Sequence, residues 1–324
     1  MKGKVLLVLA IVGMFVIPMM PAKESGINYL EDAKNLLQNW ENKLSTEGAT
    51  IEEVKEIVQK MEMYKQILEN EIKSKEDRKL SAEEIVEGVY LILQLEARIE
   101  LEKYFLKECE KAREEYRKGN IKFNFETLEI LSTSSTVYPT GGWKKWERTT
   151  GEGGIYAADY NVNEKKGYAF SRSDDYNSGY GESGLYWETW WGGVPVHWQV
   201  QYSTHYFGYS SGHVTIIEPG IPLGTNAGST EITYFAWDVY NGIKVKEVKF
   251  GGYIADSNSM EYHSAYLYPV TDFWIGNNPL EKWEIGVYFD AYTFAWGLAD
   301  MEINHYLPSM NMCWQLNSIQ ITTL

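Results

Sequence analysis

The sequence predicts an α+β protein. An N-terminal antiparallel helical hairpin or three-helix, coiled-coil-like region precedes an all-β antiparallel sandwich of jelly-roll type. Two observations predict this division. From 24 to 119 the chain carries 23 acidic and 16 basic residues, one Trp and no Pro, with apolar residues at helical spacing. The rest carries eleven of the twelve Trp and nineteen of the 24 Tyr, in short alternating segments between turn residues. We therefore expect a signal peptide at 1–22, a helical region at 23–119 and an aromatic-rich β-sandwich domain at 120–324.

The N-terminus has the pattern of a secretory signal peptide. A basic MKGK precedes an uninterrupted apolar run of 16 residues, Val5–Met20, and Ala22 is a small residue suited to a cleavage point. The alternative is an uncleaved membrane anchor, although the run is short for a span and contains Pro18. The pattern predicts a secreted or cell-surface protein, with membrane contact only if this segment is retained.

Three helices are expected in the next region. Leu30, Leu37, Trp40 and Leu44 follow one helical stripe. Thr50 with Glu53, and Ser81 with Glu84, have the spacing of capping boxes that open the second and third helices. The third helix, about 82–118, repeats Ile85, Ile92, Ile99 and Leu106 every seven residues, and Gly119 marks its end. A self-contained helical bundle and an oligomerising stalk are both consistent with this spacing.

The β region contains two hairpin signals. The first is Asn241-Gly242, which stands between two alternating apolar segments. In a further strand, Trp283, Ile285 and Val287 share one face. The stretch Tyr186–Trp198 holds four Trp in thirteen residues, with Gly192-Gly193 in its middle. If those glycines form a two-residue turn, the register pairs Trp187 with Trp198 on one face and Glu188 with His197 on the other.

This register predicts a core face and an outward face. Trp187, Trp191 and Trp198 are expected in the core. The outward face combines aromatic rings with hydrogen-bonding groups, a combination that suits carbohydrate because sugar C–H groups stack on rings and amides bind hydroxyls. The expected ligand-binding residues are Tyr186, Glu188, Trp190, His197 and Gln199. The alternative is that this face is only solvated, or is covered by the long helix.

Catalysis and metal binding have weaker support. Asp300 and Glu302 lie two residues apart on one strand, so a pair of carboxylates for glycoside hydrolysis is conceivable. Acidic loops offer oxygen ligands for a structural calcium ion, and no other cofactor is expected. The calcium candidates are Asp174, Asp175, Asn177, Asp256, Asn258 and Glu261. Cys109 and Cys313, the two cysteines, form a disulfide candidate, with two separate buried thiols as the alternative.

Charge limits the partners. The formal net charge is −15 and the sequence has no basic patch, which argues against nucleic acid. The leading hypothesis is a non-catalytic binding protein for a glycan or another cell-envelope component. The second is a structural protein that self-associates as a homo-oligomer through its helices, and the third is a secreted glycoside hydrolase.

Overall fold

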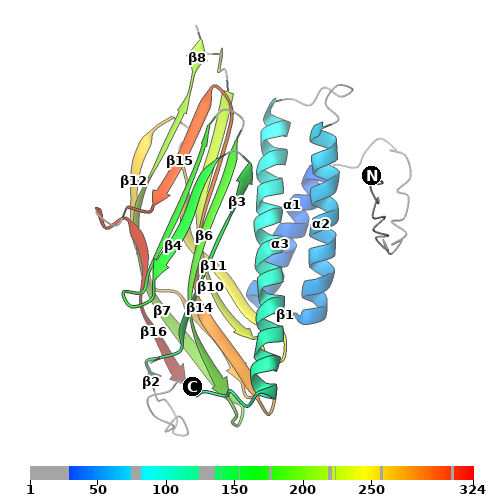
Figure 1. Cartoon of the computed structure of the whole chain (residues 1–324), viewed down its shortest axis with the longest axis vertical. Helices are drawn as coiled ribbons and strands as arrows, with labels where there is room; N and C mark the ends of the chain where they lie inside the picture. The colour runs from blue at the N-terminus through cyan, green and yellow to red at the C-terminus, as the bar shows by residue number, and fades with distance from the viewer. Residues whose placement is uncertain are drawn as a thin grey trace, which may run out of the picture.

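The computed structural model describes residues 29–73, 82–123, 136–139, 141–152, 154–174, 177–217, 221–222, 224–255, 258–307 and 310–324. Two large antiparallel sheets form a sandwich, and three helices lie against one side of it (Figure 1). The predicted α+β class with a β-sandwich body is therefore confirmed. The jelly-roll connectivity and the coiled-coil character of the helices stay predictions.

The three helices are α1 (Tyr29–Thr46), α2 (Ile51–Lys73) and α3 (Ala82–Arg117). The predicted capping box of α2 is present, since Thr50 N donates to Glu53 Oε2 at 2.9 Å and Glu53 N donates to Thr50 Oγ1 at 3.4 Å. Ser81, expected to cap α3, lies outside the described residues. Gly119 ends α3 with a φ of 72°, a left-handed conformation that suits glycine. Among the helices described, none combines the length and apolar character needed to cross a membrane.

Six strands form sheet A, in the order β1-β11-β10-β14-β6-β3. Their bounds are β1 Ala49–Thr50, β3 Trp143–Glu152, β6 Ser178–Trp191, β10 Gly224–Asp238, β11 Ile243–Ile254 and β14 Glu281–Gly297. Sheet B has the order β12-β7-β15-β5-β16-β2, with β13 paired to β7 and β4 paired to β5. Its bounds are β2 Thr136–Val137, β4 Ile155–Asn161, β5 Lys166–Asp174, β7 Val196–Val214, β12 Met260–Leu267, β13 Val270–Ile275, β15 Ala299–His305 and β16 Cys313–Thr323. A short pair, β8 (Ile216–Ile217) with β9 (Ile221–Pro222), completes the described strands.

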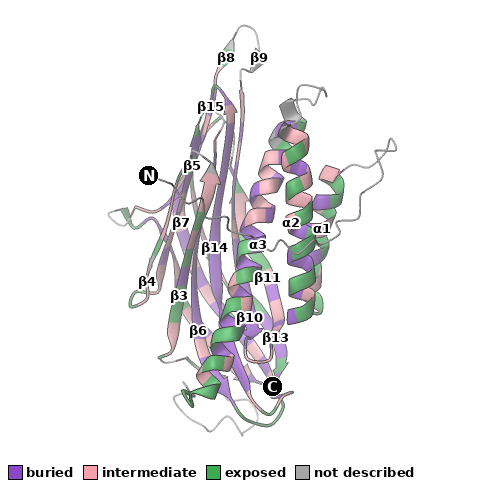
Figure 2. Ribbon diagram, turned by 45° about the vertical axis from the view of Figure 1, so that its right-hand side comes forward, coloured by how far each residue is buried: buried purple, intermediate pink, exposed green. Residues whose placement is uncertain are grey.

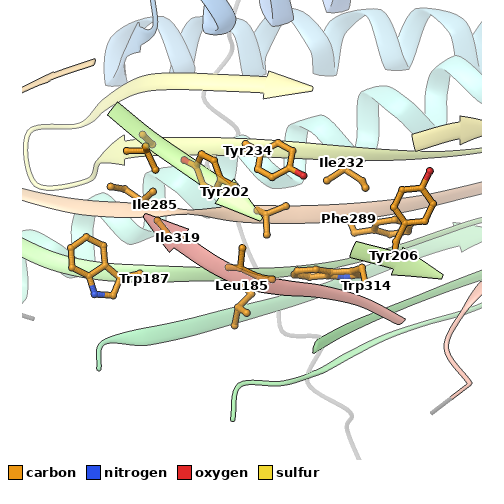
Figure 3. Packing of buried hydrophobic residues seen from close by; sticks show 14 of the residues in the cluster. Leu185, Trp187, Tyr202, Tyr206, Ile232, Tyr234, Ile285, Phe289, Trp314 and Ile319 are labelled. Carbon is orange, nitrogen blue, oxygen red and sulfur yellow. The ribbon is translucent and has the colours of Figure 1, made fainter. Parts of the chain in front are cut away.

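The main hydrophobic core lies between the two sheets (Figure 3). The three tryptophans expected in a core, Trp187, Trp191 and Trp198, all belong to it. The predicted shared face of β14 is also confirmed, because Trp283, Ile285, Val287, Phe289 and Ala291 all belong to this core.

A second core lies between sheet A and the helices. Phe105 and Cys109 of α3 pack there with Trp146, Tyr186 and Trp237 of the sheet. Figure 2 shows burial along the strands beside α3. Sheet A is therefore covered on both faces, by sheet B and by the helical layer. Of the heptad residues of α3, Ile85 and Ile99 are buried, and Ile92 and Leu106 are half-buried against the helix–sheet core, so most of this seam is used within the chain.

The two hairpin predictions had different outcomes. Asn241-Gly242 does join two paired strands, because Asp238 of β10 lies opposite Ile243 of β11 and Gly242 has a φ of 73°. The Gly192-Gly193 hairpin is wrong: β6 belongs to sheet A and pairs with β14 and β3, whereas β7 belongs to sheet B. Neither Gly192 nor Gly193 has the positive φ that a primed turn requires. The connection crosses from one sheet to the other instead of folding back.

The disulfide prediction is also wrong. Cys109 and Cys313 are free and buried. Cys109 packs between the helices and sheet A, while Cys313 begins β16 of sheet B and lies opposite Phe207. Sheet A stands between the two thiols, so they cannot form a bond without rearranging the layers.

Candidate functional site

Part of the predicted ligand face lies under the helical layer. Tyr186 is 1% exposed and Trp190 is 2% exposed. The Tyr186 hydroxyl lies 3.1 Å from the Tyr104 hydroxyl of α3, and Trp190 packs against Tyr116 and Tyr240. These two rings stabilise the helix–sheet interface and are not available to a large external ligand.

Glu188 lies on β6 of sheet A, whereas His197 lies on β7 of sheet B, so the two residues are not neighbours. It lies opposite Glu284 on β14, and its carboxylate pairs with Lys282 at 3.2 Å and Lys144 at 3.3 Å. With Trp190 it lines a cavity of about 540 Å³ near the end of α3. The five predicted residues are thus divided between two surfaces, with Tyr186, Glu188 and Trp190 on one and His197 and Gln199 on the other.

The second group lies on the outer face of sheet B. Residues of β7 alternate between the core and the outer face, since Val200, Tyr202 and Tyr206 are buried while Gln201 is exposed. His197 and Gln199 share the phase of Gln201 and are half-buried. His197, Gln199 and Gln201 therefore lie on the outer face of sheet B, opposite to the face that holds the core residues of β7.

Exposed rings accompany them on the neighbouring strands. Tyr262 and Tyr266 of β12 and Trp274 of β13 are 60%, 64% and 56% exposed. Both strands pair with β7, and the register places Tyr262 opposite Tyr209, Tyr266 opposite His205 and Trp274 opposite His197. We call Tyr262, Tyr266 and Trp274 the outer ring row.

Each ring of the outer ring row packs against a ring of β7. Tyr266 stacks on His205 with centroids 4.2 Å apart, and Trp274 stacks on His197 at 5.0 Å with an interplanar angle of 14°. Tyr262 is nearly parallel to Phe207, at 6.2 Å and 16°. This contact restricts the exposed side chains before any ligand arrives, which lowers the entropy lost on binding.

The row is long relative to a single sugar. Successive β7 partners are four and eight residues apart, so at about 3.3 Å per residue the row extends over roughly 40 Å. Between the rings lie polar side chains: Gln201 is opposite Val270 and Gln320, and Gln199 is opposite Asp272 and Thr322. The surface alternates flat rings with amide and carboxylate groups.

Histidines of this face have distinct environments. Burial lowers the pKa of His205, so the neutral imidazole is favoured at neutral pH. A neutral ring can donate and accept a hydrogen bond while stacking on Tyr266. His197 Nε2 lies 3.1 Å from Asp272 Oδ2, a contact that fixes the imidazole beside Trp274.

The two candidate catalytic carboxylates share the outer face of sheet B, as expected from their spacing. Glu302 Oε1 is bonded by the Tyr209 hydroxyl and by Asn304 Nδ2 at 3.1 Å, and Oε2 pairs with Arg172 at 3.7 Å. Asp300 lies opposite Asp174 of β5. Glu302 is thus engaged by three groups of the chain.

The calcium candidates do not form a described cluster. Asn177 donates to Asp174 Oδ1 at 3.0 Å, Asn258 Oδ1 accepts from Val214 N at 3.2 Å, and Glu261 accepts from Ser259. Asp175 and Asp256 lie outside the described residues. Across the described ranges, no group of three or more His, Cys, Asp or Glu side chains could hold a metal ion.

Comparison with known proteins gives no family. No family model matches the chain, and no curated protein matches it. Among solved structures, the enzymatically active domain of bacteriophage CBA120 tailspike protein 4 is 9% identical with a TM-score of 0.18, covering 54% of this chain and 19% of that one. TmCBM61 in complex with β-1,4-galactotriose is 9% identical with a TM-score of 0.11, covering 48% and 86%. Neither likeness carries an argument about this chain.

Sequence reasoning missed Tyr262, Tyr266 and Trp274. The segment from Tyr262 to Trp274, YHSAYLYPVTDFW, alternates exposed positions with half-buried or buried ones, and its Tyr and Trp rings fall on the exposed positions, which was a usable signal. The tryptophan-rich stretch drew attention instead because it has more rings, but most of those rings are buried.

Proposed function

We propose that this protein is a secreted or cell-surface, non-catalytic protein that binds a polysaccharide through the outer ring row. The observation that carries the proposal is the row itself: exposed rings of β12 and β13, held by stacking and in register along β7, with amide groups between them. Aromatic faces bind the C–H patches of sugar rings, and Gln side chains can hydrogen-bond to hydroxyls.

The length and charge of the surface favour a particular kind of glycan. A row of roughly 40 Å suits an extended chain of several sugars better than a terminal monosaccharide, by the rise of about 3.3 Å per strand residue. The chain has a net charge of −15, which disfavours polyanionic polysaccharides. We therefore propose an uncharged, extended polysaccharide as the ligand.

A second candidate function has its own observation. Strand β12 is an edge of sheet B and exposes Met260, Tyr262 and Tyr266, and an exposed apolar edge can pair with another copy of the same chain. Assembly would then proceed through the β-sandwich, because most of the heptad seam of α3 packs within the chain.

The test uses the mature full chain in affinity electrophoresis through gels that contain soluble neutral polysaccharides. Trp274→Ala and Tyr266→Ala should abolish the retardation seen for the wild type. Phe250→Ala is the matched control, because Phe250 is 47% exposed but lies on β11 of sheet A. Sedimentation of the same variants tests the alternative.

Three outcomes are distinct. Retardation lost in Trp274→Ala and kept in Phe250→Ala supports polysaccharide binding. A wild-type dimer that becomes monomeric in Tyr266→Ala, with no retardation by any gel, replaces it with assembly. Retardation that survives both row substitutions overturns the proposed site.

A further inference from the structure

A second polar site lies inside the molecule, away from the outer ring row. A cavity of about 290 Å³ separates sheet A from α1 and α3. Its sheet side is formed by Tyr180, Glu182 and Asp290, and its helix side includes Gln38, Gln94 and Arg98. Such a volume is near the lower end of the range for small-molecule sites, about 300–1,000 Å³.

The sheet side holds two carboxyl groups whose pKa values are shifted in opposite directions. Glu182 and Asp290 lie directly opposite one another on β6 and β14, and Tyr180 contacts both, at 2.9 Å from Asp290 Oδ1. Burial and the neighbouring Glu182 raise the pKa of Asp290. Burial opposes ionisation of Glu182 too, but Arg148 bonds both of its oxygens and lowers its pKa below the usual value.

The helix side offers the amides of Gln38, which is exposed, and Gln94, which is half-buried. Arg98 closes this side and is held by carboxylates. It is 8% exposed, and its Nη2 donates to Glu247 at 2.7 Å and pairs with Glu102 at 2.6 Å. An amide can both donate and accept a hydrogen bond, so the two glutamines suit a ligand hydroxyl.

The cations around the cavity are already matched by carboxylates. Arg148 pairs with Glu182, Lys34 pairs with Glu87, and Lys249 pairs with Glu41 at 2.7 Å and with Glu231 at 2.6 Å. A charged ligand would have to displace one of these pairs. The lining therefore favours a neutral ligand that can both donate and accept hydrogen bonds.

We propose that this cavity binds a neutral, hydroxyl-rich ring of monosaccharide size. Ligand hydroxyls would exchange hydrogen bonds with Gln94 and Tyr292, while Leu37, Leu91 and Leu101 contact the C–H faces. The partly exposed pair of Lys249 and Glu41 lines this cavity and also a neighbouring one of about 300 Å³ beside α1. This site is independent of the outer ring row, and either can exist without the other.

The experiment is isothermal titration of the full chain with glucose, galactose, mannose and glycerol. At least one hexose should bind, and Ala97→Leu should weaken that binding at least tenfold, about 1.4 kcal/mol, by filling the cavity that Ala97 lines. Trp274→Ala should leave hexose binding unchanged, which separates this site from the outer ring row. If Ala97→Leu does not fold, Gln94→Leu replaces it with the same expected loss.

Two results would overturn the proposal. The first is that none of the four probes gives a saturable heat with the wild type, which means the cavity holds only water. The second is that a hexose binds Ala97→Leu or Gln94→Leu as tightly as the wild type. If the hexose is instead lost in Trp274→Ala and kept in Ala97→Leu, the binding belongs to the outer ring row.

Discussion

Glu102 is the residue whose replacement tests the helix–sheet interface most directly. It interrupts the heptad pattern of α3, and it is fully buried against sheet A. Its carboxylate accepts from Trp40 Nε1 at 2.8 Å and pairs with Arg98 at 2.6 Å and Lys244 at 2.8 Å. Glu247 completes the cluster, which contains two cations and two carboxylates. The perturbation is Glu102→Gln, which preserves the shape and removes one charge.

The expected loss follows from what the substitution leaves behind. In Glu102→Gln, Arg98 and Lys244 share the single carboxylate of Glu247, and the Lys244 side chain is 0% exposed. Removing one partner of a buried ion pair costs about 3–5 kcal/mol, because the remaining charge is desolvated and uncompensated. That is a large part of a typical free energy of unfolding, roughly 5–15 kcal/mol. Replacing opposite charges together, in Glu102→Leu with Lys244→Met, should recover part of the loss.

The assay is urea denaturation followed by tryptophan fluorescence, with Glu100→Gln as the matched control. Glu100 lies on the same helix with a side chain that is 54% exposed, so its variant should stay within about 0.5 kcal/mol of the wild type. If Glu102→Gln loses less than about 1 kcal/mol, the cluster is not the buried, compensated network described here. Equal losses of unfolding free energy in Glu102→Gln and Glu100→Gln would also show that the cluster is not such a network.

Three further predictions concern other sites. Trp190→Ala should lower the free energy of unfolding by about 3–5 kcal/mol, measured by denaturation, without changing polysaccharide binding. Trp274→Ala should abolish polysaccharide binding, measured by titration, without changing the free energy of unfolding. Burial raises the pKa of Asp238 to about 7 from its ordinary 3.8, so the folded chain keeps a proton that the unfolded chain releases between these values. The free energy of unfolding of the wild type should therefore fall as pH rises through that interval. In urea titrations over the same range, the free energy of unfolding of Asp238→Asn should fall less steeply. Equal dependence on pH in the two proteins would contradict the raised pKa of Asp238. Because burial raises the pKa of Cys109 to about 12 and Cys313 is also buried, a thiol reagent should label neither cysteine in the folded chain and both after denaturation. If the denatured chain were labelled only after a reductant is added, the two cysteines would form a disulfide.

Local patterns predicted the elements well. The stop at Gly119 and the box of Thr50 with Glu53 depend on a few neighbouring residues, and both are present. The alternation of β7 and β14 also identified correctly which residues share a face, because one face of each strand meets the same core whichever strand lies beside it.

Pairing between strands was harder to predict because it depends on distant segments. The Gly192-Gly193 connection has the composition of a tight hairpin, yet β6 and β7 find partners in different sheets. A polar residue on a strand also does not show that its face is exposed to solvent. Glu182 and Glu284 are buried because Arg148 and the helical layer lie over them. The predicted ligand face failed for that reason, and only His197 and Gln199 retained their outward position.

The double coverage of sheet A has a consequence for dividing the chain. Composition changes sharply near residue 119, but the aromatic surface around Trp146, Trp237 and Tyr288 is buried only while α3 lies on it. A fragment that starts after the helices would expose this surface to water together with Glu247 and Lys244, stripped of their partners on α3. Contiguous apolar surface of this kind promotes aggregation. The helices therefore act as a permanent solubilising cover for the sandwich, even though the two regions differ sharply in their content of Trp and Tyr.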